Sequence, residues 1–401
     1  MFKFIHCADL HLGSPFAGVR KLDPAAARKL ALAPFSAFDR LADAALENHA
    51  LFMALSGDVF DSDAPSLYAE TRFRETIGRL DAAGVKVFWA KGNHDSGVEL
   101  EGLPANTTVF PPGRAAVFQV SDGGKVAASV AGISHASSAE TRDLAPETDA
   151  LLSGAPGFRV AVLHANIDGA PGYEPYAPAP LEELRRGHAD YWALGHIHKR
   201  RVLCERPMAV YSGSPQGRSI NEPGARGGFL VEVDDAGVPH LAELDVQEVR
   251  FETLVLDDLA SVADTGTLLR VFRDALPELS GALRLRLILS GGTGLNSRLR
   301  SADEAGLAEM FSSALRRRLP EAELESVVVN TTALPSASRR EGLAAEVAAV
   351  RNELDLEAEL AALPLAPSEF SGFSEAELAA IAREAEELLL DYLCGDLRSG
   401  K

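Results

Sequence analysis

The stretch FKFIHCADLH, residues 2–11, opens with a short apolar run and places two polar side chains, Asp9 and His11, directly after it. The run has the length and composition of a buried β-strand. Residues two positions apart on extended backbone point to the same side, so Asp9 and His11 can converge on one centre. The stretch therefore predicts a strand that delivers two polar groups at its carboxyl end.

The composition is that of a globular chain with more than one domain. Its 401 residues exceed one ordinary compact domain, so two or three units are expected. With 46% hydrophobic and 24% charged residues, the chain can bury a sizeable core. The formal net charge of −19 argues against binding nucleic acid by a general basic surface. Nucleic acid stays open as a substrate, because bound metal ions can supply local positive charge.

The three cysteines, Cys7, Cys204 and Cys394, are far apart in the chain. Their spacing predicts neither a disulfide framework nor a zinc site, so we expect a reducing cytoplasm. No stretch has the pattern of a signal peptide, and no apolar run approaches the roughly 18 residues that span a bilayer. The sequence therefore predicts a cytoplasmic protein with no membrane association.

Residues 1–248 alternate short apolar runs with helical patterns at about 35–49 and 68–83, which is typical of an α/β layered domain. Strands are predicted at 2–6, 51–56, 85–90, 126–133, 158–164, 190–195, 208–213 and 228–233. Residues 249–335 have the pattern strand, helix, strand, helix, strand, which predicts a small α+β domain. In that domain the run LRLRLIL alternates and predicts a half-exposed strand.

Residues 336–401 are almost entirely helical in pattern and rich in Ala, Leu and Glu. Ser374 and Glu377 have the spacing of a capping box at the start of a long apolar stripe. Two interpretations stay open for this stripe. It packs back on the body of the protein, or it is a docking surface for a helix of a partner.

Polar side chains follow five of the predicted strands at their carboxyl ends. In chain order the motifs are D-x-H, G-D-x-x-D, G-N-H-D, a single His, and G-H-x-H. Each motif alone is weak, but the ordered set is specific, and strand ends of α/β sheets are where sites form. The residues are Asp9 and His11, Asp58 and Asp61, Asn93, His94 and Asp95, His164, and His196 and His198. His6 and Cys7 match no motif position, and we interpret both as packing residues.

This mixture of side chains suits divalent metals. Carboxylate, imidazole and amide oxygen groups are ligands for manganese, iron or zinc. A carboxylate between two metals can bridge them, and a pair about 3.5–4 Å apart can activate water and steady both oxygens of a phosphoryl transfer. A further His that is not needed as a ligand can protonate the leaving oxygen.

These motifs resemble those of the calcineurin-like metallophosphoesterases over roughly residues 5–200. Within that superfamily, ADLHLGSPF, GDVFD, KGNHD, GHIHKR and YSGSPQGRSINEPG are similar to the SbcD-type DNA repair nucleases, and the opening FIHCADLHLGSPF looks most like the YhaO-like branch. The resemblance implies an α/β (α+β) fold: a β-sandwich flanked by helices in 1–248, a small capping domain in 249–335 and a helical C-terminal region in 336–401.

The resemblance also implies roles by position. Asp58 would bridge two divalent metal ions, His94 would act as acid or transition-state stabiliser, and Asp95 would orient His94. We expect Mn²⁺, with Fe²⁺, Zn²⁺ or Mg²⁺ as alternatives. The ligands would be Asp9, His11, Asp58 and His198 for one metal and Asp58, Asn93, His164 and His196 for the other. Asp61 stands where some relatives carry a catalytic His, and it either orients a ligand or caps the next helix.

The loop YSGSPQGRSINEPG, residues 211–224, offers Gln216 and Arg218 as contacts for a substrate phosphate. The alternative is an ordinary loop rich in Gly, Pro and Ser. Beside it, HKRR at 198–201 adds basic residues that either contact phosphate or form a solvated turn.

The implied function is a Mn²⁺-dependent DNA exonuclease or endonuclease of double-strand-break repair. It would work in the cytoplasm, associated with the nucleoid, with an SMC-like coiled-coil ATPase of the SbcC type docked on the helical region. A homodimer is left open. One alternative keeps the metals and changes the substrate to a small phosphodiester or a phosphoprotein. Another makes the chain mainly a structural adaptor for the ATPase.

Overall fold

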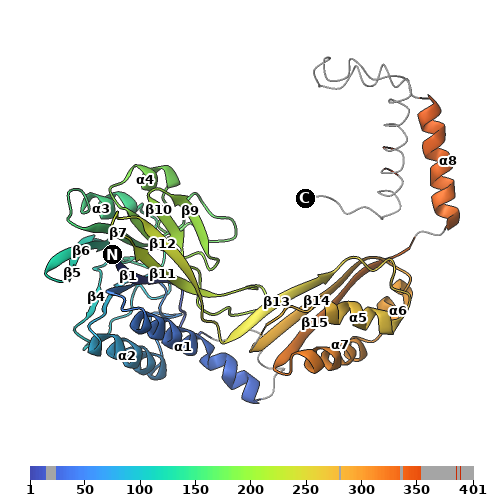
Figure 1. Ribbon diagram of the computed structural model, residues 1–401, viewed down its shortest axis with the longest axis horizontal. Helices are drawn as coiled ribbons and strands as arrows, with labels where there is room; N and C mark the ends of the chain where they lie inside the picture. The colour runs from blue at the N-terminus through green and yellow to red at the C-terminus, as the bar shows by residue number, and fades with distance from the viewer. Residues whose placement is uncertain (15–23, 280, 335–336, 354–384, 386–388, 390–401) are drawn as a thin grey trace. The chain divides into compact units, whose positions relative to one another are not determined.

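The computed structural model describes residues 1–14, 24–279, 281–334, 337–353, 385 and 389. The chain divides into two compact units. The first unit comprises Met1–Glu252 and Gly281–Arg284, and the second comprises Thr253–Ser280 and Leu285–Lys401. Figure 1 labels the helices and strands of both units.

Two six-stranded sheets build the first unit. The first sheet has the order β12 (Pro239–Asp245), β11 (Gly227–Val233), β1 (Phe2–Cys7), β2 (Phe52–Ser56), β3 (Lys86–Ala90) and β4 (Thr107–Val109). The second has the order β5 (Ala116–Asp122), β6 (Lys125–Gly132), β7 (Phe158–His164), β8 (Tyr191–Gly195), β10 (Met208–Tyr211) and β9 (Arg201–Glu205). The central strands β1, β2 and β3 run parallel, and so do β7 and β8.

The two sheets pack face to face around an apolar core. In this core the rings of Phe4 and Phe52 stack with centroids 4.6 Å apart, and Tyr191 of the other sheet meets Phe4 edge-on at 5.3 Å. Helices α1 (Pro24–Glu47) and α2 (Leu67–Ala82) cover the outer face of the first sheet, while α3 (Ala145–Ala150) and α4 (Leu181–Arg186) lie against the second. Because central strands are buried on both faces, their sequences are nearly continuous apolar runs. The expected sandwich flanked by helices is confirmed (Figure 1).

Every strand predicted in this unit is present, and the packing roles of His6 and Cys7 are confirmed by their complete burial. Helix α1 begins at Pro24, well before the predicted start, and runs through Pro34. Helix α2 begins at Leu67, where the Ser66 side chain accepts a hydrogen bond from the Ala69 N–H at 3.2 Å. The cap of this helix is therefore Ser66 rather than Asp61.

The three-stranded sheet β13 (Val249–Leu256), β14 (Ala282–Thr293) and β15 (Ala322–Ala333) belongs mainly to the second unit, together with α5 (Thr265–Asp274), α6 (Asn296–Ser301) and α7 (Glu304–Arg318). Phe272 of α5 meets Phe311 of α7 edge-on at 5.0 Å. Along β14 the leucines at 283, 285, 287 and 289 are buried and Arg286 and Ile288 are partly exposed, so the predicted alternation holds from residue 285 onward; Arg284 is buried as well and breaks it at the start.

Helix α8 (Ala337–Glu353) lies in the predicted helical region. Most of the rest of that region, including the capping box at Ser374 and Glu377, lies outside the described residues. Among the residues that the structure describes, no helix combines the length and the apolar character needed to cross a bilayer.

Candidate metal centre

The loops that follow β1 and β2 are joined by backbone hydrogen bonds. The Asp9 N–H donates to the Gly57 carbonyl at 3.0 Å, and the His11 N–H donates to the Asp58 carbonyl at 3.0 Å. From the second sheet, the His196 N–H donates to both carboxylate oxygens of Asp9, at 3.1 and 3.2 Å. These bonds bring the carboxyl ends of strands from both sheets to one place.

The backbone at this place is held in a conformation that L-residues rarely adopt. Positive φ angles occur at Asp9 (53°), His11 (45°), Asp58 (50°) and His196 (97°). Each such residue costs about 1–3 kcal/mol, and strain of this kind concentrates at functional sites. Four of the predicted ligands therefore share a strained backbone that their surroundings enforce.

Glycines give these side chains room. A Cβ on Gly57 would collide with the imidazole of His164, and a Cβ on Gly92 would collide with the carboxylate of Asp58. The G-D and G-N pairs of the motifs thus reflect close packing between the loops as well as turn formation.

The four predicted histidine ligands each present one nitrogen to a hydrogen-bond acceptor. The contacts are His11 Nδ1 to Asp61 Oδ1 at 2.9 Å, His164 Nδ1 to the Ser56 carbonyl at 2.9 Å, His196 Nε2 to the Glu174 carbonyl at 2.8 Å, and His198 Nδ1 to Glu222 Oε1 at 2.8 Å. A carboxylate or carbonyl only accepts, so each contacting nitrogen carries the hydrogen. The other nitrogen of each neutral ring keeps its lone pair, as a metal ligand must.

The remaining nitrogens of three of these rings converge. His11 Nε2 lies 3.2 Å from His198 Nε2, and His164 Nε2 lies 3.0 Å from Asn93 Oδ1. Three overlapping groups of potential ligand atoms each fit within 4.8 Å: Asp9, His11 and His198; Asp9, Asp58 and His164; and His11, Asp58 and His94. Asp9 and Asp58 each belong to two groups, so either carboxylate is placed to be shared.

The donor set fits divalent cations, because the carboxylates of Asp9 and Asp58 lie close to imidazole nitrogens of His11, His164 and His198, and the Asn93 amide oxygen lies beside His164. His196 belongs to none of these groups, although its N–H holds the Asp9 carboxylate. Asp58 Oδ2 lies 3.3 Å from His164 Nε2. Burial opposes the charged form of Asp58, but the charge and hydrogen bond of His164 outweigh it and lower the pKa of Asp58. Burial likewise lowers the pKa of His164, yet Asp58 raises it to about 9. A proton and a metal ion would therefore compete for the Nε2 atom of His164.

His94 lines the pocket with a side chain that is 40% exposed. Its backbone N–H donates to Asp58 Oδ1 at 2.9 Å, and its Nδ1 lies 3.3 Å from the Asp61 carbonyl oxygen. Asp95 does not contact this ring in any hydrogen bond described. Its carboxylate accepts instead from the N–H groups of Val59 and Gly92, both at 2.7 Å. Asp95 therefore fixes the loops after β2 and β3, and the orienting contact to His94 comes from Asp61.

Gln216 and Arg218 differ in their surroundings. Gln216 is 3% exposed, and all its hydrogen bonds described go to backbone groups of 217, 248 and 249. The side chain joins the loop to the start of β13, so it has no free polar atom for a phosphate, contrary to the prediction. Arg218 does line the pocket, and its Nη1 lies 3.0 Å from Asp61 Oδ1. Asp61 thus contacts both His11 and Arg218, which supports its interpretation as an orienting residue.

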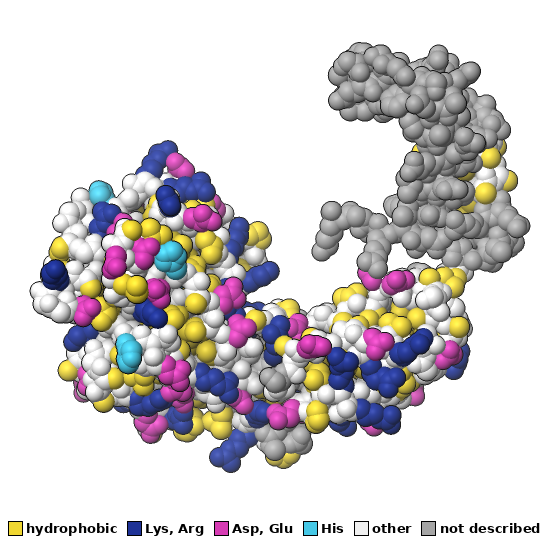
Figure 2. Space-filling model, in the orientation of Figure 1, with side chains coloured by type: hydrophobic (Ala, Val, Ile, Leu, Met, Phe, Trp, Pro, Cys, Tyr) yellow, Lys and Arg dark blue, Asp and Glu magenta, His cyan; other side chains and the backbone are white. Residues whose placement is uncertain are grey.

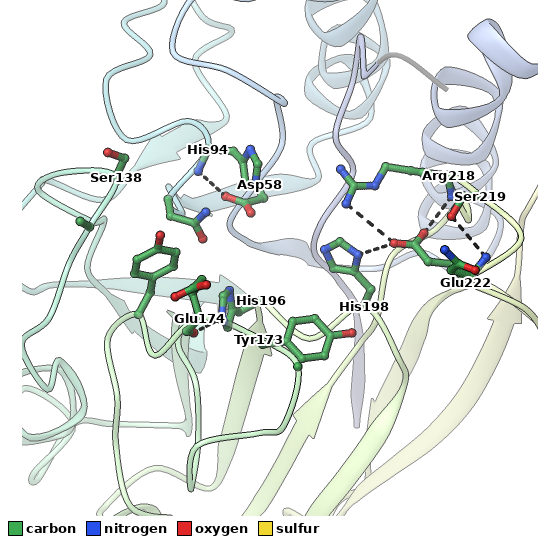
Figure 3. A pocket seen from close by; sticks show the side chains of 15 residues that line it. Asp58, His94, Ser138, Tyr173, Glu174, His196, His198, Arg218, Ser219 and Glu222 are labelled. Carbon is green, nitrogen blue, oxygen red and sulfur yellow. Dashed lines mark hydrogen bonds and ion pairs between the residues drawn. The ribbon is translucent and has the colours of Figure 1, made fainter. Parts of the chain in front are cut away.

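The pocket above these groups has a volume of about 730 Å³. Figure 3 shows His94 and Asp58 on one side, Tyr173, Glu174 and His196 on another, and His198 with Arg218 and Glu222 on a third. The sequence interpretation did not include Tyr173, Glu174, Tyr176 or Glu222. Glu222 could have been found, because it is the one carboxylate in the loop 211–224. The tyrosines come from the Pro/Gly-rich segment 168–180, whose composition indicates only a loop.

Several known proteins are similar to this chain in sequence. The family model for calcineurin-like phosphoesterases matches residues 2–200. Over 302 residues, 72% of this chain and 71% of the relative, the sequence is 32% identical to the uncharacterized metallophosphoesterase YhaO of Bacillus subtilis.

More distant matches include two proteins of which the chain covers less than two thirds. It is 28% identical over 232 residues to the DNA double-strand break repair protein Mre11 of Thermoplasma acidophilum, covering 55% of this chain and 60% of that protein. It is 24% identical over 267 residues to one of the subunits of the nuclease SbcCD of Bacillus subtilis, covering 55% of this chain and 63% of that protein. With the match to YhaO over most of both sequences, these findings place the chain in a family: it belongs to the calcineurin-like phosphoesterases.

Proposed function

We propose that the chain is a phosphodiesterase that uses two divalent metal ions, with Mn²⁺ as the expected metal, and that its substrate is DNA. Members of its family are phosphoesterases with a dinuclear metal site. The observation that carries the proposal is the cluster of His11, His164 and His198 around the carboxylates of Asp9 and Asp58, in which each imidazole is oriented by a hydrogen bond through one nitrogen.

The proposed ligands divide into two sites. The first metal site consists of Asp9, His11, Asp58 and His198, and the second of Asp58, Asn93, His164 and His196. Bound cations would supply Lewis-acid polarisation of the phosphate and activation of water.

The protein's own groups have separate tasks. His94 stands at the exposed edge of the site, where it can donate a proton or hydrogen bond to the leaving oxygen. Its Nδ1 faces the Asp61 carbonyl and carries a hydrogen, so the proton for the leaving oxygen would come from Nε2 of the doubly protonated ring. The Arg218 guanidinium adds positive charge at the pocket wall. Figure 3 shows His94 and Arg218 on different sides of the pocket, so the proposed acid and the guanidinium would approach a phosphate from different sides.

DNA as the substrate is proposed from the relatives, and an ATPase partner from the resemblance of the motifs to the SbcD-type nucleases. Mre11 is named as a DNA double-strand break repair protein, and the SbcCD relative is named as one subunit of a nuclease. On the face in Figure 2, basic and acidic side chains are interspersed over the described residues. A net charge of −19 with such a surface favours contact with DNA through the metals and a partner subunit rather than through a broad basic face. We assign the proposed DNA-cleaving activity to double-strand-break repair, in a complex with an SMC-like ATPase.

The pocket favours a second candidate substrate of the same chemistry. Its volume of about 730 Å³ lies in the range of small-ligand sites, and Tyr173 and Tyr176 flank it with aromatic rings. A mononucleotide, a cyclic nucleotide or the end of a DNA strand would fit such a site. Turnover compared on DNA, cyclic nucleotides and phosphopeptides separates a nuclease from a small-molecule phosphodiesterase or a phosphatase.

The test of the proposal uses linear and hairpin DNA and the chromogenic ester bis(p-nitrophenyl) phosphate, with Mn²⁺. His94→Ala should lower turnover by about 10²–10⁴-fold and leave Mn²⁺ binding largely intact. His240→Ala is the matched control, because His240 is 60% exposed and pairs with Asp234 outside the pocket. Equal rates for parent and His94→Ala would show that the assigned role is wrong.

A further inference from the structure

A chain of five side chains closes around the first metal site. Asp61 Oδ1 accepts from His11 Nδ1 at 2.9 Å and from Arg218 Nη1 at 3.0 Å. Glu222 Oε1 accepts from His198 Nδ1 at 2.8 Å and lies 3.8 Å from Arg218 Nη2. The two ends of this chain, His11 Nε2 and His198 Nε2, face each other at 3.2 Å.

Arg218 is the central member of this chain. Its backbone N–H also donates to Glu222 Oε2 at 2.8 Å, so main chain and side chain both hold the same carboxylate. The side chains of Arg218, Asp61 and Glu222 are 26%, 23% and 18% exposed, so solvent screens these contacts only in part. Figure 3 shows Arg218 and Glu222 beside His198 at the edge of the pocket.

The second metal site is supported differently. His164 donates to the Ser56 carbonyl and His196 donates to the Glu174 carbonyl, so neutral backbone groups orient both rings. A carboxylate that accepts from an imidazole raises the basicity of the ring's other nitrogen more than a carbonyl does. The two sites therefore differ in how strongly their histidines donate to a cation.

We propose that Asp61, Arg218 and Glu222 form a brace that orients His11 and His198 and gives the first metal site the higher affinity. Arg218 is then a positioning residue for this metal, beyond any contact with substrate. The inference rests on the proposed function in one respect, that His11 and His198 bind metal.

The brace acts through geometry and charge together. The two carboxylates fix the ring planes and the tautomers of His11 and His198, while the guanidinium holds the carboxylates and offsets part of their repulsion. Without Arg218, Asp61 and Glu222 lose their common partner and are free to turn toward solvent. Loss of an outer partner of this kind typically costs about 10–100-fold in metal affinity.

The test is a titration of the metal-free protein with Mn²⁺ alone, in which the electron paramagnetic resonance signal of free Mn²⁺ gives the bound equivalents. The parent should bind two equivalents, one more tightly than the other. Arg218→Met should weaken the tighter equivalent by about tenfold or more and leave the weaker one unchanged. Glu222→Gln should weaken the same equivalent. Asn93→Ala shows which equivalent belongs to which site: it removes a ligand from the second metal site only, so the equivalent that it weakens is the one bound there.

Arg159→Met is the matched control. Arg159 pairs with Asp190 at 2.6 Å, and its side chain is 31% exposed, close to the value for Arg218. The Arg159→Met variant should bind both equivalents of Mn²⁺ with the affinities of the parent. Thermal unfolding without metal checks that each variant folds. If Arg218→Met does not fold, Arg218→Lys replaces it, because lysine keeps the positive charge but lacks the two-pronged guanidinium.

Three results would overturn the inference. Parent-like affinity for both equivalents in Arg218→Met, with only a higher KM for substrate, would make Arg218 a substrate contact alone. Equal weakening of both equivalents would mean that the loop, rather than one metal site, depends on Arg218. A parent that binds no second equivalent would refute the dinuclear assignment itself, which separates failure of the proposed function from failure of the brace.

Discussion

Replacing Gly92 by alanine tests how tightly the candidate metal centre is packed. A Cβ at this position would lie 2.8 Å from His164 Cδ2 and 2.9 Å from the Asp58 backbone nitrogen, and it would collide with the Asp58 carboxylate. All of these atoms belong to the site, so the strain must displace one of its ligands. Overpacking of this kind costs about 1–3 kcal/mol, and we expect the free energy of unfolding in EDTA to fall by about 2 kcal/mol.

The control is the same substitution at Gly78 in helix α2, where a Cβ would meet nothing within 4 Å. Alanine in a helix interior is about 0.5–1 kcal/mol more stable than glycine. One chemical change should therefore lower stability at residue 92 and raise it at residue 78.

The assay is denaturant unfolding followed by tryptophan fluorescence. The chain has two tryptophans, Trp89 in β3 and Trp192 in β8, and each is 1% exposed, so the signal reports on the first unit. At a Mn²⁺ concentration of 100 Kd, one bound ion adds about 2.7 kcal/mol to the free energy of unfolding. A tenfold loss of affinity reduces that gain to about 1.4 kcal/mol. If Gly92→Ala matches the parent both in EDTA and in its gain with Mn²⁺, the close packing described here is wrong.

Three further changes have defined outcomes. Lys91→Met removes a buried ammonium that donates to the carbonyls of Ser96 and Val98 at 2.8 and 3.0 Å, and it should lower the free energy of unfolding by about 2–3 kcal/mol in the same fluorescence assay. Burial and a hydrogen bond with Asp143 raise the pKa of Glu183 from 4.5 to about 7, so the folded state keeps a proton that the unfolded state has lost, and this group's contribution to stability falls as pH rises from about 4.5 to 7. Glu183→Gln should therefore gain more stability over the parent at pH 8 than at pH 4, and an equal effect at both would contradict the assignment. Tyr173→Ala should raise KM for a nucleotide ester by about tenfold while Tyr173→Phe stays near the parent, if the ring stacks on a base; steady-state kinetics with both variants decides this.

The central strands and the ligands could be predicted because two signals coincide there. Strands buried on both faces, such as β2 and β8, need apolar side chains at nearly every position, and the ligands follow directly where the apolar run ends. The outer strands β5, β9 and β12 expose most of their residues and mix polar with apolar side chains, so they lack the continuous apolar run that predicts a buried strand. The early start of α1 was missed because Pro34 normally marks a helix boundary.

The partners of the ligands could not be predicted, because they depend on which loops meet. Asp95 follows His94 in the chain, yet its carboxylate turns toward the loop after β2, and the carbonyl that faces the His94 ring belongs to Asp61. Gln216 and Arg218 are two positions apart in a loop, but one is buried against β13 and the other lines the pocket. A motif gives residue types and order, whereas these contacts follow from the packing of segments distant in sequence.

The strand ends that build the centre are far apart in the chain, and this separation has a kinetic consequence. The Nε2 atoms of His11 and His198 lie 3.2 Å apart, yet the two residues are 187 positions apart in the chain and follow strands of different sheets. Contacts this distant form late, because the chain must first close long loops. A metal ion that needs both would bind only after the rate-limiting step of folding, so added Mn²⁺ should slow unfolding and leave the refolding rate unchanged. The metal would then set how long a folded molecule lasts rather than how quickly it forms.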